Sequence, residues 1–84
     1  MEDAKLDRTP VRYLSAERMT EDDLGRKFTM KKGEVVYDAK TVSGSWATMT
    51  QYSYDLIGYP GGLGLGKGQK YVRQANGQLW KVEG

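Results

Sequence analysis

The sequence contains neither cysteine nor histidine, and these two absences exclude much of the chemistry that small proteins carry. Without cysteine there is no disulfide, no thiolate metal site and no cysteine nucleophile. Without histidine, the commonest metal ligand and the commonest general base near neutral pH are missing, and a Ser/His/Asp triad is excluded. We therefore expect no enzymatic activity, no bound metal and no cofactor.

Long apolar runs are also missing. No stretch approaches the roughly 18 apolar residues that are needed to cross a membrane. The sequence begins MEDAKLDRTPVRYL, which is charged throughout and does not resemble a signal peptide. These features predict a soluble, intracellular protein that does not bind a membrane.

The chain has 84 residues, a length typical of one domain. A chain this short buries only about 60–65% of the surface that its unfolded form exposes, so a partner chain would add useful stability. The net charge of +2 is small but unevenly placed, with seven acids and four bases in residues 1–23, and nine bases and four acids in residues 24–84. Residues 1–12 have little apolar content and predict a flexible arm. Residues 13–84 predict a single small globular domain.

The first part of this domain predicts a short helix followed by two strands. Capping residues ahead of Gly25 predict one or two helical turns. Residues 26–30 and 35–39 alternate between apolar and polar side chains, as strands do, on either side of a turn at residues 31–34. We therefore expect a β-hairpin here.

The interior helix is predicted within residues 46–58. Thr50 is a suitable N-cap and Gly58 a suitable end. The residues that share one stripe of this helix are Tyr52, Leu56 and Tyr59. With about two turns, the helix must be held by packing rather than by propensity.

A second hairpin is predicted in residues 69–84, where Asn76-Gly77 is typical of a two-residue turn with positive φ at both positions. The expected cross-strand pairs are Ala75 with Gln78, Arg73 with Trp80, Tyr71 with Val82, and Lys70 with Glu83. In this register the Arg73 guanidinium lies near the Trp80 indole. Together the elements predict an α+β or mostly β domain of four to five short strands, with one short helix and an N-terminal arm. A barrel of SH3-like size is its expected closed form.

The glycine-rich stretch GYPGGLGLGKGQKY, residues 58–71, resembles a phosphate-binding loop but lacks its chemistry. The residue after Lys67 is glycine, so no hydroxyl is available to hold magnesium. The loop is also predicted to leave a helix and enter a strand, the reverse of a phosphate-binding loop. We expect no nucleotide binding, and interpret the stretch as a turn that Leu63 and Leu65 anchor to the core.

Six tyrosines, two tryptophans and one phenylalanine are more aromatic residues than a small core needs, and Tyr and Trp dominate protein interfaces. Trp46 is expected in the core, and exposed tyrosines are expected among Tyr52, Tyr54 and Tyr59. The sequence thus favours a module that binds another protein or a second copy of itself. The predicted binding residues are Tyr59, Leu63, Leu65, Tyr71 and Trp80.

The alternative is a small nucleic-acid-binding barrel, in which cations and aromatic rings together hold a single strand. The residues that would form this surface are Lys27, Lys31, Lys70, Arg73 and Trp80.

Residues 24–84 resemble small, uncharacterised proteins of tailed bacteriophages. The resemblance lies in the Trp-Ala-x-Met segment that starts at Trp46, the Gly-Leu-Gly loop ending in Gly-Gln-Lys-Tyr, and the closing Trp-x-Lys strand. It implies a phage accessory protein, either a minor virion component or an inhibitor of a host enzyme. The location it implies is the cytoplasm of the host cell or the virion.

Overall fold

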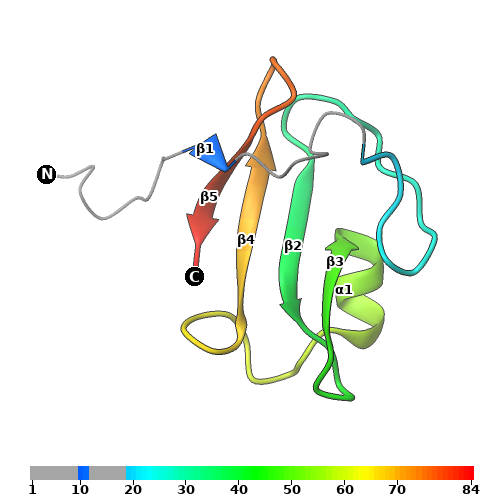
Figure 1. Ribbon diagram of the computed structural model, residues 1–84, viewed down its shortest axis with the longest axis vertical. Helices are drawn as coiled ribbons and strands as arrows, with labels where there is room; N and C mark the ends of the chain where they lie inside the picture. Colours follow the sequence, from blue (N-terminus) through cyan, green and yellow to red (C-terminus); the bar gives the residue numbers. More distant parts are fainter. Residues whose placement is uncertain (1–9, 12–18) are drawn as a thin grey trace, which may run out of the picture.

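The computed structural model describes residues 10–11 and 19–84. Five strands form one antiparallel sheet in the order β1-β5-β4-β2-β3 (Figure 1). The elements are β1 (Pro10–Val11), β2 (Val35–Lys40), β3 (Trp46–Thr50), α1 (Gln51–Ile57), β4 (Gly68–Arg73) and β5 (Leu79–Glu83). The predicted α+β class, with short strands and one short helix in a small domain, is confirmed.

The sheet is open, because β1 and β3 stand at its two ends and no pairing joins them in the described part of the chain. The expected closed barrel is therefore not what forms. Side chains of α1 pack against β2 and β3 on one face of the sheet, and Met19, Phe28 and Met30 pack against the other face. Pro10–Val11, predicted as part of the arm, pair with β5, and the rest of residues 1–12 lies outside the described residues.

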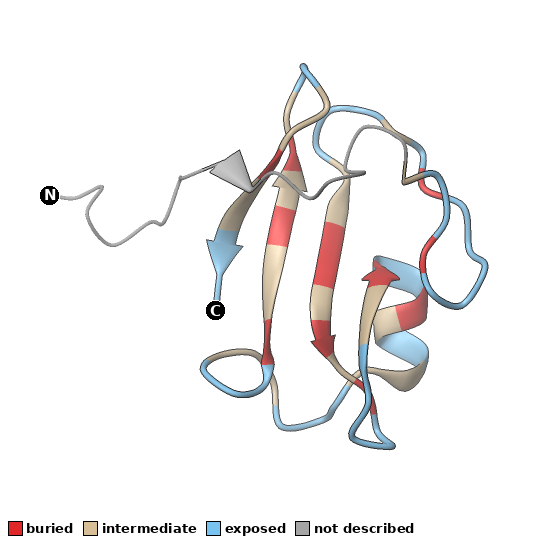
Figure 2. Cartoon of the chain, viewed as in Figure 1, coloured by how far each residue is buried: buried red, intermediate tan, exposed pale blue. Residues whose placement is uncertain are grey.

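Alternation along β2 sends neighbouring side chains into two separate cores (Figure 2). Val36 lies in one core, and Tyr37 and Ala39 lie in the other. The first core is completed by Phe28, Tyr71 and Leu79, with Met19 and Met30 packed against it. The second is completed by Met49, with Val35, Ala47, Tyr54, Ile57 and Leu63 packed against it. The strand predicted from the alternation of residues 35–39 is confirmed, and Val35, Tyr37 and Ala39 share one of its faces.

Residues 26–30 are not the strand that their alternation predicted. Only Lys27 makes a bridge, to Glu21, and Met30 has a φ of +65°. The segment crosses the sheet to place Phe28 in the core, and the Glu34 carboxylate holds it by accepting the amide protons of Thr29 at 2.6 Å and Met30 at 3.0 Å. The turn at residues 31–34 is confirmed.

The helix predicted ahead of Gly25 is also wrong within residues 19–25, where the chain turns back on itself instead; residues 13–18 lie outside the described residues. Asp22 N donates to Arg26 O at 2.7 Å, and Gly25 N donates to Asp22 O at 3.0 Å. The side-chain bonds of Asp22, described below, make this turn more favourable than a short helix.

The interior helix is confirmed. The Thr50 hydroxyl accepts from Ser53 N at 3.1 Å, and Gly58 N donates to Tyr54 O at 2.8 Å. The residues before the cap form β3, which the sequence analysis did not identify. Trp46, expected in the core, is about half exposed because it begins this edge strand beside the exposed turn at residues 42–45.

The second hairpin is confirmed, but its register is shifted. Gln74 N donates to Gln78 O at 2.7 Å, which closes a three-residue loop with Gly77 at a φ of +90°. The observed pairs are Arg73 with Leu79, Val72 with Trp80 and Tyr71 with Lys81, and a bulge restores Lys70 opposite Glu83. This register buries Arg73 and Leu79 together, and moves Trp80 away from the face that carries Arg73.

Candidate functional site

The glycine-rich loop is a closed turn with an exposed tip. Gly64 and Gly68 exchange two backbone hydrogen bonds, each 2.9 Å long. Leu63 packs against the core beneath α1, as predicted, whereas Leu65 is 100% exposed and anchors nothing. Tyr59, before the turn, is also exposed. The loop leaves α1 and enters β4, so its predicted context is confirmed.

Gly68 is the position in this loop where glycine is required. Its φ is +144°, and a Cβ there would overlap Ala39 on the neighbouring strand β2. The backbone that approaches Gly68 closely is therefore that of the chain's own strand β2.

Of the predicted binding residues, Tyr71 lies in the core and Trp80 is partly buried. Tyr71 is 6% exposed and packs with Phe28, Val36 and Leu79. Trp80 is half-buried. Its indole N–H is buried without a hydrogen-bond partner in the described part of the chain, so this N–H is not accessible to a ligand. The structure thus does not join the loop, Tyr71 and Trp80 into one surface.

The predicted nucleic-acid surface is divided in the same way. Arg73 is fully buried, and its guanidinium donates to Glu34 Oε1 at 3.1 Å and to Gly77 O at 3.0 Å. Lys27 and Lys31 are exposed on the segment that covers one face of the sheet, whereas Lys70 pairs with Glu83 on the strands. Arg73 is thus a structural residue here, because the three-residue loop turns its side chain inward.

The structure gathers a different set of residues between α1 and the turn at residues 22–25. The exposed side chains there are Leu24, Arg26, Tyr52 and Leu56, which we call the helix–turn face. Two adjoining hollows open on it, and both are lined by Arg26 and Tyr52.

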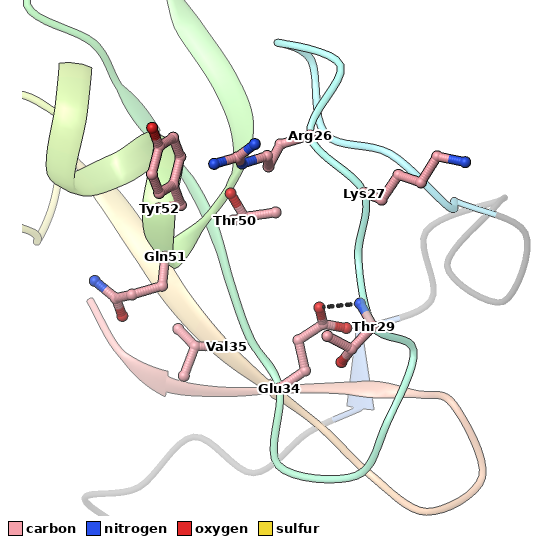
Figure 3. Close-up of a pocket in the computed structure, with 8 residues that line it drawn as sticks. All are labelled: Arg26, Lys27, Thr29, Glu34, Val35, Thr50, Gln51 and Tyr52. Atoms are coloured by element: carbon pink, nitrogen blue, oxygen red, sulfur yellow. Dashed lines mark hydrogen bonds between the residues drawn. The ribbon is translucent and has the colours of Figure 1, made fainter.

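One hollow, of about 300 Å³, is mainly apolar. It is lined by Leu24, Gly25, Arg26, Tyr52, Ser53, Leu56 and Ile57. The other, of about 340 Å³, has more charged and polar residues in its lining and is shown in Figure 3. It is lined by Arg26, Lys27, Thr29, Glu34, Val35, Thr50, Gln51 and Tyr52.

Asp22 positions the turn against the helix. It is buried, and its Oδ1 accepts from the amides of Leu24 at 3.0 Å and Arg26 at 2.8 Å. Its Oδ2 accepts from Thr50 N at 2.9 Å, Thr50 Oγ1 at 3.0 Å and Ser53 Oγ at 2.6 Å. One carboxylate thus ties the turn to the cap and first turn of α1.

Burial alone would raise the pKa of Asp22. The hydrogen bonds from Ser53, Thr50 and Arg26 lower it, and together their effect exceeds that of burial. The pKa of Asp22 is therefore below its ordinary value of 3.8. Asp22 is therefore ionised near neutral pH.

Two further contacts make this part of the molecule rigid. Asp23 binds the outer edge of β3, where its amide donates to Thr48 O at 2.9 Å and its Oδ2 accepts from Thr48 N at 2.8 Å. On the other side of α1, the rings of Tyr37 and Tyr54 stack with centroids 3.9 Å apart. Burial raises the pKa of both tyrosines, so they stay neutral near pH 7.

Arg26 and Tyr52 form the centre of the helix–turn face. The Arg26 guanidinium carbon lies 3.6 Å from the centroid of the Tyr52 ring. Figure 3 shows Arg26 extending toward Tyr52, whereas Lys27 points away from it. Stacking holds the guanidinium flat and leaves the N–H groups at its rim available to a ligand.

Sequence reasoning found part of this face. It predicted the stripe of Tyr52 and Leu56, and an exposed tyrosine at position 52, but not Leu24 or Arg26. The signal that was available is Asp22 three residues before Gly25, a spacing typical of a tight turn.

Comparison with family models, curated proteins and solved structures finds no match. Across residues 10–11 and 19–84, no cluster of acidic side chains is arranged to hold a metal ion. No helix of that part is both long and apolar enough to span a membrane.

Proposed function

We propose that this chain is a non-enzymatic protein-binding module that binds its partner through the helix–turn face. The observation that carries the proposal is the grouping of Leu24, Tyr52 and Leu56, each about half exposed or more, around an apolar hollow. Exposed apolar side chains that gather around a hollow are typical of interaction sites, whereas scattered ones are not.

The rigidity of this face supports the same conclusion. The turn and the helix are fixed to each other by Asp22, so a partner does not have to order them on binding. A preorganised surface loses less entropy on association and gains affinity accordingly.

The resemblance of residues 24–84 to small proteins of tailed bacteriophages suggests where such a module acts. On this proposal the chain is a phage accessory protein, either a minor virion component or an inhibitor of a host enzyme. Its partner is then a virion subunit or a host protein.

The test is a capture experiment in which the full chain and two matched variants, Leu56→Ser and Leu65→Ser, serve as bait for virion subunits and host proteins. Both leucines are exposed, at 61% and 100%, so neither change should unfold the protein. We expect Leu56→Ser to release the captured protein and Leu65→Ser to retain it. Loss with Leu65→Ser alone would instead assign binding to the glycine-rich loop, and capture unaffected by either change would contradict the proposal.

A further inference from the structure

We infer that the helix–turn face recognises a peptide segment in which a carboxylate stands beside a large apolar side chain. This inference rests on the proposed function and names the chemistry of the partner. The carboxylate would bind Arg26, and the apolar side chain would enter the hollow lined by Leu24, Leu56 and Ile57.

The charge balance around Arg26 favours an anionic ligand. Within residues 19–84, no carboxylate lies within ion-pair distance of its guanidinium. Asp22 is saturated by its own donors. Glu34 is occupied by Thr29 N, Met30 N and Arg73.

The remaining charges near the face are accounted for as well. Asp55 accepts from the Gln51 amide at 2.9 Å, and Asp23 from Thr48 N. Lys27 lies across a backbone bridge from Glu21, and its side chain points away from Tyr52 (Figure 3). Arg26 is therefore the cation that stands at the centre of the face, between the two hollows, without a carboxylate of residues 19–84 at ion-pair distance.

The geometry of the guanidinium also favours such a ligand. An arginine that stacks on an aromatic ring presents parallel N–H groups at its edge, which match the two oxygens of a carboxylate. Because Arg26 and Tyr52 line both hollows, a carboxylate bound there would lie next to the apolar hollow. The neighbouring side chain of the same peptide would then reach Leu56.

A nucleic acid fits this face less well. Stacking on Tyr52 would suit a base, but the hollow beside Leu24 and Leu56 is mainly apolar, and Lys27, the other cation that lines the two hollows, points away from Tyr52 (Figure 3). A protein segment uses both the charge and the apolar hollow.

The test begins with a library of random dodecapeptides displayed on yeast and selected on the full chain. We expect the recovered peptides to share an Asp or Glu next to Leu, Phe, Tyr or Trp, and to lose binding to Leu56→Ser. The strongest peptide is then measured by fluorescence anisotropy, together with its Glu→Gln or Asp→Asn counterpart. Losing the charged contact should weaken binding at least about tenfold.

Arg26→Gln provides the decisive variant. This change should lower the affinity for the acidic peptide at least about tenfold. The acidic peptide and its amide counterpart should then bind the variant with affinities within about twofold of each other. Lys27→Gln is the matched control, a neighbouring cation that points away from Tyr52, and should change the affinity less than about twofold.

Other outcomes would contradict either the partner chemistry or the assignment of a peptide to this face. Recovered peptides that need Leu56 but carry no acid overturn the partner chemistry and leave the proposed function standing. Failure to recover any peptide that needs Leu56 overturns the peptide assignment. Binding of a 20-nucleotide oligothymidine that Arg26→Gln abolishes would assign the face to nucleic acid. Dimerisation that Leu56→Ser abolishes would assign it to a second copy of the chain.

Discussion

Asp22 does the most among single residues to hold the helix–turn face in shape, since its carboxylate joins the turn at residues 22–25 to the cap of α1. It is buried, and each of its oxygens accepts from at least one backbone amide. A buried carboxylate in such a site is costly to replace, because amide donors cannot turn away from an unsuitable partner. Leu24 and Arg26 keep their positions beside the helix only while these bonds hold.

We therefore expect Asp22→Asn to lower the free energy of unfolding by about 2 kcal/mol, because the amide group places N–H donors against N–H donors. Urea denaturation at pH 7 measures the change. Asp23→Asn is the matched control: its exposed side chain accepts one bond, from Thr48 N, which the amide oxygen of Asn can still accept, so the cost should stay below about 1 kcal/mol. Equal costs for the two variants would contradict the role given to Asp22.

The pH dependence of the same variant gives an independent check. The folded-state pKa of Asp22 is lowered from 3.8, so its stabilisation is fully present above the unfolded-state pKa and is lost as the pH falls through the folded-state value. The difference in unfolding free energy between wild type and Asp22→Asn should stay constant from pH 7 to about 5 and shrink below about 4. A difference that grows on acidification would mean that the pKa is raised instead.

Among the elements, those that local chemistry determines were predictable and those that depend on distant contacts were not. The Thr50 cap and Gly58 mark α1 within a few residues of sequence, and alternation marks β2. The turn at Asp22 depends on bonds to Thr50 and Ser53, 28 and 31 residues away. The local sequence fits both this turn, through Asp22 three residues before Gly25, and a capped helix, so it does not by itself assign Leu24 and Arg26 to the helix–turn face.

The strand register of the second hairpin also depends on distant contacts and could not be predicted from its turn residues. Asn76-Gly77 fits both a two-residue turn and a three-residue loop that ends in a left-handed glycine. The choice is made by burial, since the longer loop places Leu79 beside Phe28 and Val36 and directs Arg73 to Glu34. A shift of one residue therefore turned Tyr71 and Arg73 from predicted binding residues into core residues.

The junction of the glycine-rich loop with β4 carries a prediction at the same scale. Gly68→Ala should lower the free energy of unfolding by about 2–3 kcal/mol, because a Cβ would overlap Ala39 in a conformation that already strains L-residues. Gly66→Ala is the control: its φ is +78°, but no atom lies within 4 Å of the added carbon, so its cost should be about 1 kcal/mol. Thermal denaturation of both variants measures the difference, and a harmless Gly68→Ala would mean that β2 and β4 are less closely packed there.

At the scale of the whole molecule, an open sheet carries one small core on each face, and eight large apolar side chains of the described residues remain exposed. What remains exposed is unevenly placed. The glycine-rich stretch exposes Leu65 at its tip and Tyr59 before the turn, whereas α1 and the turn beside it expose three large apolar groups around a hollow that Arg26 also lines. A partner gains more buried area and a charged contact on the second surface, which is why we assign binding to the helix–turn face.

Photo-crosslinking tests this assignment most directly. A benzophenone amino acid replaces Leu56 in one protein and Leu65 in another, and each full chain is irradiated with the acidic peptide selected from the library. The account predicts a covalent adduct of chain and peptide from position 56, reduced by Arg26→Gln, and none from position 65. An adduct from position 65 but not from position 56 would contradict it and return the binding site to the glycine-rich loop.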